Sequence, residues 1–142
     1  MARALPAVTV GGHRIALPAA TVRRLVRGVL AGERRRAGVS VTFLGRRAMR
    51  TLNKRWKGHD RPTDVISFAL PDAAGGLLGD IYLCPEVAER EARRRSLTVR
   101  EELSRLVIHG TLHVLGWDHP EGEGREHSAM WRKQERYLER LG

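Results

Sequence analysis

The sequence predicts an α+β protein, in which a small sheet is covered by surrounding helices. Three observations lead to this fold class. Short apolar stretches rich in strand-forming residues alternate with amphipathic stretches, in the order strand, helix, strand, helix, strand, strand and then three helices. The 142 residues, 42% hydrophobic and 30% charged, suit one soluble globular domain. No internal repeat or linker divides the chain, so we expect a single domain over residues 1–142.

Two strands and two helices are expected in the first part of the chain. Residues 8–17 combine strand-forming residues with a Gly-Gly pair, which is compatible with one strand or with a hairpin. Pro18 suits the first turn of a helix, and apolar residues follow it at helical spacing: Val22, Leu25, Val26, Val29 and Leu30. We expect residues 39–45 to form a buried strand and residues 46–56 to form a short helix.

A hairpin is expected in the middle of the chain. Residues 64–70 and 80–84 are typical of strands, and the glycines between them favour a hairpin connection. A helix over residues 85–95 follows, with a proline near its start. Cys84 has no second cysteine to pair with, and its apolar neighbours predict a buried, unreactive thiol.

Two more helices complete the expected fold. Thr98 and Glu101 form the T-x-x-E capping pattern that opens a helix, and Gly116 suits the C-terminal end of that helix. A last amphipathic helix follows Pro120. We expect Met130, in this helix, to pack in the core rather than to form a Met-turn like that of zinc proteases.

The net charge of +10 is concentrated in the first part of the chain. Residues 1–61 carry 15 Lys and Arg but only two acidic residues, whereas residues 62–142 carry 11 Lys and Arg and 14 acidic residues. Such a basic half predicts a polyanionic partner, with nucleic acid favoured over a membrane surface. The alternative is a coding bias toward arginine, which supplies 23 of the 26 basic residues.

The composition also bears on cellular location. No stretch approaches the roughly 20 apolar residues that span a bilayer. Residues 1–14 contain no apolar segment followed by a cleavage site, so no signal peptide is expected. Together with the single cysteine, these features predict a cytoplasmic protein in a reducing compartment, without a membrane partner.

The segment HGTLHVLGWDH, residues 109–119, carries the strongest functional signal. His109 and His113 are four residues apart on one face of the expected helix, and His119 follows after Gly116. This is the ligand spacing of the metzincin proteases, H-E-x-x-H-x-x-G-x-x-H. Three neutral imidazoles leave a tetrahedral zinc ion one open position, typical of a catalytic site, in which a water molecule can have a pKa of about 7.

The other histidines carry weaker signals. We expect His13 and His127 to face solvent. His59, in a basic loop, either contacts a phosphate or is an incidental loop residue. For the three histidines of residues 109–119, the alternative is a purely structural set at a helix end.

Gly110 stands where the zinc proteases have the glutamate that acts as general base. This weighs against proteolysis, because the base must then come from elsewhere or from the substrate. RNA supplies its own nucleophile, the 2′-hydroxyl; alternatively, metal hydroxide attacks the phosphorus directly. The sequence leaves both routes open.

Three segments together resemble one known family. The segment HGTLHVLGWDH resembles H-G-x-L-H-L-x-G-Y-D-H, a signature of the YbeY family of bacterial endoribonucleases. Residues 52–68, LNKRWKGHDRPTDVISF, resemble its L-N-x-x-Y-R-x-x-D-x-P-T-D-V-L-S-F segment. Residues 78–92, LGDIYLCPEVAEREA, resemble its L-G-D-I-x-I-x-x-x-x-A segment. The three matches come in the family's order and cover roughly residues 40–120.

The resemblance implies one Zn²⁺ ion held by His109, His113 and His119, with His113 also serving catalysis. It implies cleavage of single-stranded RNA, maturation of the 16S ribosomal RNA 3′ end and ribosome quality control. The implied partners are ribosomal RNA and the small ribosomal subunit, with the GTPase Era as a further candidate. The implied fold is a mixed, four-stranded sheet with surrounding helices and a zincin-like metal helix.

One position departs from the family pattern. The family has a functionally important arginine in its Y-R pair, and the aligned pair here is Trp56–Lys57. Lysine keeps the charge but lacks the fork of donors with which arginine binds phosphate. We therefore predict that Lys57 is catalytic and that Arg55, Lys57 and Arg61 bind RNA. A solvated Lys57 without a role is the alternative.

Four further residues admit two interpretations each. Asp64 and Asp80 either support the metal site or make structural turn bonds. Asp118 either accepts a hydrogen bond from a ligand imidazole or plays no such part. Trp117 either packs in the core or offers a stacking surface for a base.

These observations predict a zinc-dependent endoribonuclease that acts on ribosomal RNA. The alternative is a non-catalytic ribosome assembly factor in which zinc is chiefly structural. A metalloprotease shares the ligand spacing, but Gly110 opposes it.

Overall fold

The computed structural model describes residues 6–12, 16–73, 75–120 and 124–142, so the prediction for His13 lies outside the described residues. The helices and strands follow the predicted order. They are β1 (Val8–Gly12), α1 (Ala19–Glu33), β2 (Gly38–Phe43), α2 (Arg46–Lys57), β3 (Val65–Pro71), β4 (Leu77–Leu83), α3 (Pro85–Arg94), α4 (Val99–Val114), the 3₁₀ turn η1 (Arg125–His127) and α5 (Ala129–Leu141).

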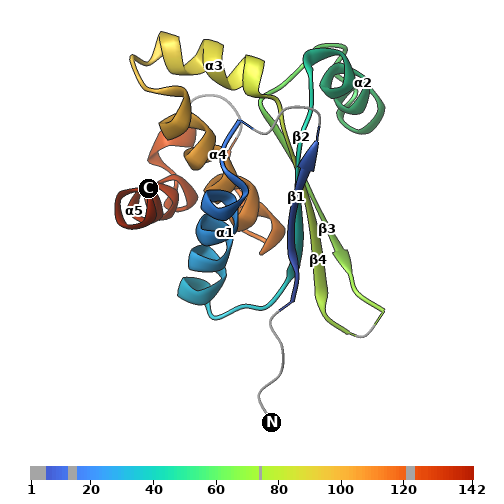
Figure 1. Cartoon of the computed structure of the whole chain (residues 1–142), viewed down its shortest axis with the longest axis vertical. Helices are drawn as coiled ribbons and strands as arrows, with labels where there is room; N and C mark the ends of the chain where they lie inside the picture. Colours follow the sequence, from blue (N-terminus) through green and yellow to red (C-terminus); the bar gives the residue numbers. More distant parts are fainter. Residues whose placement is uncertain (1–5, 13–15, 74, 121–123) are drawn as a thin grey trace.

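The four strands form one mixed sheet in the order β1-β2-β4-β3 (Figure 1). β1, β2 and β4 are parallel, and β3 runs antiparallel to β4, which confirms the predicted hairpin. Val8–Gly12 pairs with β2 as a single strand, so of the two structures considered for residues 8–17 the strand is the one observed. The mixed sheet with surrounding helices confirms the predicted α+β fold class.

The helices are divided between the two sides of the sheet. α1 and α4 pack on one side, and α3 and α5 pack on α4 from outside (Figure 1). α2 lies on the other side, where Met49 joins Ile66 and Cys84 in a small second core. Cys84 is fully buried, which confirms the predicted burial, and burial raises the pKa of its thiol, as expected for an unreactive cysteine.

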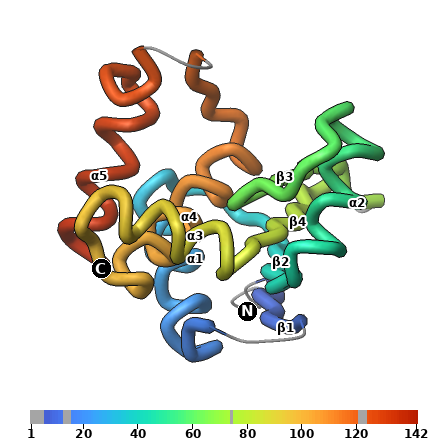
Figure 2. Tube along the Cα trace, turned by 90° about the horizontal axis from the view of Figure 1, so that it is seen from above, coloured from blue at the N-terminus to red at the C-terminus, as the bar shows by residue number. Residues whose placement is uncertain are grey.

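α4 is the central helix of the molecule, in contact with α1, α3, α5, β3 and β4 (Figure 2). Every residue from 102 to 112 is buried, as expected for a helix surrounded by other elements. Despite this burial, no helix among the described residues combines the length and apolar character needed to cross a bilayer. The burial of residues 102 to 112 shields most side chains in the second half of α4 from solvent.

Both ends of α4 follow the local signals in the sequence. The Thr98 hydroxyl accepts a hydrogen bond from the backbone N–H of Glu101 at 3.1 Å, as the capping pattern predicts. At the other end, Gly116 has a φ of +98°, a conformation that favours glycine. In α5, Met130 is 1% exposed within the main core, which confirms its predicted packing role.

Two glycines allow α4 to approach the sheet closely. A Cβ atom added at Gly79, in β4, would lie 2.5 Å from Val114 Cγ1. A Cβ atom added at Gly110 would lie 2.8 Å from Ile81 Cγ2 and 3.0 Å from Ser67 Oγ. The backbones of helix and strand are therefore closer together than side chains at these positions would permit.

We expect Gly79→Ala to lower the free energy of unfolding by about 1–3 kcal/mol, because the stiff Val114 side chain has little freedom to move away. Gly11→Ala is the matched control, since Gly11 lies in β1 and has no atom within 4 Å of an added Cβ. Urea unfolding of both variants measures the difference. Equal effects of the two substitutions would contradict a tight contact between α4 and β4.

Candidate metal centre

The structure brings the three predicted ligands together. His109 and His113 lie in the last two turns of α4, and His119 lies in the loop that follows. The ring centroids are 4.5 Å apart for His109 and His113, 5.1 Å for His109 and His119, and 5.0 Å for His113 and His119. The candidate ligand nitrogens all lie within 4.8 Å of one another, so a single ion can be shared by the three rings.

The loop after α4 reverses the chain so that His119 faces the helix. The Gly116 N–H donates to the His113 carbonyl and the Trp117 N–H to the Leu112 carbonyl, both at 3.0 Å. The Trp117 indole donates to Glu33 Oε1 at 2.9 Å and packs against the main core. This anchors the loop on α1 and shows the packing role of Trp117. Trp117 also borders a hollow with Lys57 and His113, so the stacking role stays a prediction.

Two of the histidines have one ring nitrogen engaged away from the cluster. His109 Nδ1 lies 2.6 Å from Gln134 Oε1, and His119 Nδ1 lies 2.9 Å from the Pro120 carbonyl oxygen. The His113 ring faces the backbone of Trp117, which favours its protonated form and so acts against the lowering of its pKa by burial. Partners of this kind fix ring orientation in metal sites and leave the other nitrogen for the ion.

Asp118 does not take the role considered for it. Its Oδ1 accepts a hydrogen bond from the backbone N–H of His119 at 2.8 Å, whereas the His119 ring bonds to the Pro120 carbonyl. The carboxylate is exposed and shapes the loop. The suggestion that Asp118 accepts a hydrogen bond from a ligand imidazole was therefore wrong.

The two helix histidines are held in their neutral form. Burial, and then the neighbouring His113, lower the pKa of His109 to about 3. Burial, and then His119, also lower the pKa of His113. Arg125 acts in the same direction on both. A neutral imidazole has a free lone pair, and imidazole nitrogens are ligands that fit a borderline divalent ion such as zinc.

A cavity of about 450 Å³ opens beside the three histidines. Lys57 and Arg61 line it, as two of the three predicted RNA-binding residues. His59 and Arg125 also line it. Arg55 does not: it borders a separate hollow on the outer face of α2, with Arg47, Arg50 and Lys54. The cavity therefore joins the candidate metal ligands to positive charge.

The two predicted aspartates have different surroundings. Asp80 Oδ1 accepts a hydrogen bond from Ser40 Oγ at 2.7 Å, between neighbouring strands, which favours the structural interpretation. Asp64 lines the histidine cavity, and its Oδ1 accepts a hydrogen bond from the Val65 N–H at 2.8 Å. Burial raises the pKa of Asp64, against the opposing effect of Arg125.

The structure explains why this chain lacks a glutamate at position 110. The Cβ direction of Gly110 points at Ile81 and Ser67 in the sheet, at 2.8 and 3.0 Å. A glutamate there would clash with the sheet. Side chains of the sheet therefore occupy the space that the glutamate of a zinc protease would need, while the three histidines keep their spacing.

Two residues of the site were missed in the sequence. Gln134 had a usable signal, because it lies on the apolar face of α5, four residues after Met130 and three before Tyr137. A polar residue in such a stripe requires a buried partner. Arg125 follows the loop after Pro120 and carries no comparable signal, because no regular pattern surrounds it.

The fold and the histidine cluster define a class of small mixed α+β domains with a candidate three-histidine metal centre on a buried helix. The sequence model of the endoribonuclease YbeY family matches residues 12–142. The chain therefore belongs to the YbeY family of endoribonucleases, which confirms the resemblance seen in its motifs.

Individual relatives agree with this assignment. "Endoribonuclease YbeY" of Thermotoga petrophila is 39% identical over 103 residues, covering 72% of this chain and 67% of the relative. The protein of the same name from Aquifex aeolicus is 38% identical over 102 residues, covering 70% of this chain and 67% of the relative. A solution structure of a Thermotoga maritima protein superposes with a TM-score of 0.65 at 31% identity, covering 94% and 88% of the two chains.

We expect His119→Ala to reduce zinc affinity by at least an order of magnitude, since only two of the three imidazoles remain. His127→Ala is the matched control, because His127 is exposed and does not belong to the cluster. Competition with a chromophoric chelator measures both affinities, and thermal unfolding with added zinc gives an independent measure of ligand-induced stabilisation. Identical zinc affinities in the two variants would contradict the assignment of the site.

Proposed function

We propose that this chain is a zinc-dependent endoribonuclease that cleaves single-stranded RNA. The observation that carries the proposal is the cluster of three histidines, two of them neutral, facing a cavity lined by Lys57, Arg61 and Arg125. Metal-assisted cleavage of a phosphodiester requires ligands for the metal ion and positive charge near the phosphate at the same place. The relatives named endoribonuclease support RNA as the substrate.

The protein's own part in this reaction is to bind and orient the phosphodiester. Zinc, when bound, supplies Lewis-acid stabilisation of the charge that develops on the phosphoryl oxygens. Lys57 and Arg61 lie where their charges can hold the phosphate against the three histidines. Lys57 acts as a point charge, and Arg61 adds the planar fork of donors that lysine lacks.

The nucleophile and the proton acceptor need not come from position 110. RNA carries a 2′-hydroxyl beside each phosphodiester, so an oriented strand can supply its own nucleophile. Asp64 is the carboxylate that lines the histidine cavity among the described residues, and burial raises its pKa. A carboxylate at this place is a candidate to take part in proton transfer with the bound strand.

A basic surface continues from the cavity along α2. This α2 surface consists of exposed residues on the outer side of the helix: Arg46, Arg47, Arg50, Lys54, Arg55 and Trp56. Trp56 is 58% exposed, and Lys57 at the end of the same helix lines the histidine cavity. Arginines beside an exposed aromatic ring suit a single strand, whose backbone is anionic and whose bases stack.

We infer the biological setting from membership of the family. Ribosomal RNA is the proposed substrate, with maturation of the 16S 3′ end and ribosome quality control as the processes served. The small ribosomal subunit and the GTPase Era are the proposed partners, in the cytoplasm. The competing function is a ribosome assembly factor in which zinc only stabilises the fold.

We expect His113→Ala to lower the rate of cleavage of a single-stranded RNA by at least 100-fold, while the affinity for that RNA changes less than threefold. The reason is that His113 is a candidate metal ligand, whereas the positive charges around the cavity remain. Gel analysis of products from nuclease-free preparations, with and without chelator, measures cleavage, and fluorescence anisotropy measures binding. Cleavage that survives in the variant would exclude this site, and a wild type that binds zinc without cleaving any RNA would favour the assembly factor.

We expect Lys57→Ala and Arg61→Ala each to weaken RNA binding and to reduce the slope of log affinity against log salt by about 0.7, the value for one phosphate contact with a single strand. Arg136→Ala, an exposed arginine of α5, is the matched control. Anisotropy titrations between about 50 and 200 mM salt measure the slope. An unchanged slope in both cavity variants would place RNA elsewhere on the molecule.

A further inference from the structure

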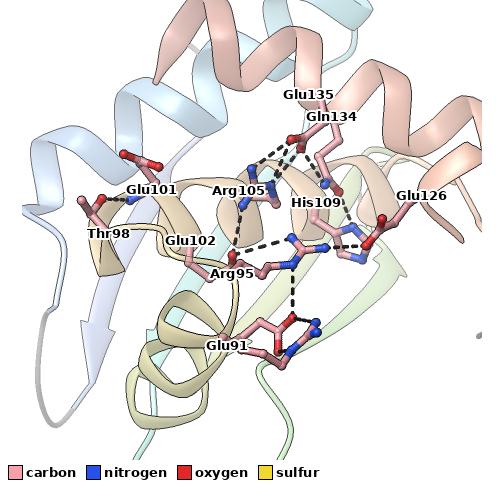
Figure 3. Close-up of polar contacts among 11 residues, drawn as sticks. Glu91, Arg95, Thr98, Glu101, Glu102, Arg105, His109, Glu126, Gln134 and Glu135 are labelled. Carbon is pink, nitrogen blue, oxygen red and sulfur yellow. Dashed lines mark hydrogen bonds and ion pairs between the residues drawn. The ribbon is translucent and has the colours of Figure 1, made fainter.

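We propose that Gln134 is a positioning residue that holds His109 in the tautomer and orientation required for metal binding. The inference deepens the proposed function, and it rests on the metal site rather than on RNA cleavage. It concerns a contact between α4 and α5, where Gln134 points toward His109 (Figure 3).

The contact is short and shielded from water. His109 Nδ1 lies 2.6 Å from Gln134 Oε1. Gln134 is 1% exposed and His109 is 4% exposed, so water does not compete for either group. A buried hydrogen bond of this kind is costly to lose, because the remaining partner stays unsatisfied.

The direction of this hydrogen bond is set by the next residue along α5. Glu135 carries a carboxylate, which accepts hydrogen bonds from Arg105 Nε and Arg105 Nη2, both at 2.9 Å. Gln134 Nε2 donates to Glu135 Oε2 at 3.1 Å. Since the carboxylate only accepts, the amide nitrogen faces it and the amide oxygen faces His109.

The tautomer of His109 follows from this arrangement. An amide oxygen only accepts, so Nδ1 of His109 must carry the proton. Its Nε2 then keeps the lone pair that a metal ligand needs. The chain of hydrogen bonds from Arg105 through Glu135 and Gln134 therefore fixes His109 in the metal-binding tautomer in the metal-free protein.

The anchor of this arrangement lies outside the metal site. Arg105 Nη1 also bonds to Glu102 Oε2 at 3.0 Å, one turn earlier in α4. Arg95 approaches the same Glu102 oxygen at 4.0 Å and pairs with Glu126 at 2.6 Å (Figure 3). The polar network thus joins the end of α3, α4, η1 and α5, and Gln134 contacts it through its hydrogen bond to Glu135.

Gln134 is a side-chain partner of a ligand imidazole, so its substitution can change the metal affinity of the site. The partners of His113 and His119 are backbone groups of Trp117 and Pro120. A substitution at position 134 therefore changes one ligand and leaves the partners of the other two. Substitution of such outer partners typically weakens metal affinity by about 10- to 100-fold.

The experiment compares Gln134→Leu, which removes the acceptor, with Gln134→Glu, by chelator competition for zinc in the full-length protein. A buried carboxyl group next to the Glu135 carboxylate takes up a proton, so its C=O oxygen still accepts from His109 and its O–H replaces the amide donor to Glu135. We expect zinc affinity to fall about 10- to 100-fold in Gln134→Leu and to change less than fivefold in Gln134→Glu. Met130→Ala is the packing control, because Met130 is equally buried in α5 and lies in the apolar core. It should lower thermal stability with little effect on zinc affinity. If the leucine variant does not fold, Gln134→Met serves in its place.

A second measurement needs no metal. Histidine ring ¹⁵N spectra of the metal-free protein should show His109 protonated at Nδ1 in wild type and in Gln134→Glu, and a mixture of tautomers in Gln134→Leu. Unchanged zinc affinity and an unchanged tautomer in Gln134→Leu would overturn the proposal, as would a loss of zinc affinity no larger than that of Met130→Ala. A protein that binds zinc through this arrangement but cleaves no RNA would refute only the proposed function.

Discussion

The close packing of α4 against the sheet is the constraint on which the rest of this structure depends. Gly79 and Gly110 remove the side chains that would otherwise separate the helix from β4 and β3. The same contact places His109 deep in the protein, leaves His113 half-buried, and closes the position where a zinc protease carries its glutamate. One packing interface therefore retains the ligand geometry of a protease and removes the base that proteolysis requires.

A buried metal site in the middle of a domain needs polar partners that are themselves buried. Glu102 and Arg105 lie in α4 at 2% and 9% exposure, and burial raises the pKa of Glu102 although Arg105 and Arg95 oppose the shift. Such buried pairs contribute little net stability, because desolvation offsets much of their attraction. Here Arg105 fixes the Glu135 carboxylate, and this carboxylate orients the Gln134 amide so that its oxygen faces His109.

The uneven charge of the chain has a structural counterpart. Many acidic residues of the second half are engaged with nearby arginines, in the pairs Glu89–Arg93, Glu91–Arg94, Glu126–Arg95 and Glu135–Arg105. On α2, Arg50 and Lys54 lie near the carboxylate of Asp60, and no other ion pair of this helix is seen among the described residues. Part of the excess positive charge thus lies on α2 and at the histidine cavity, where it suits an anionic strand, whereas Arg23, Arg24, Arg27 and residues 34–36 lie on or directly after α1.

The sequence alone determined the features that depend on neighbours within a few residues. The i, i+4 spacing of His109 and His113, the turn at Gly116 and the cap at Thr98 are local, so the ligand set and the ends of α4 were predictable. Only the tertiary structure decided the rest. The pairing of His109 with Gln134, the exclusion of Arg55 from the cavity and the closure of position 110 each join segments distant along the chain, and no local pattern encodes such contacts.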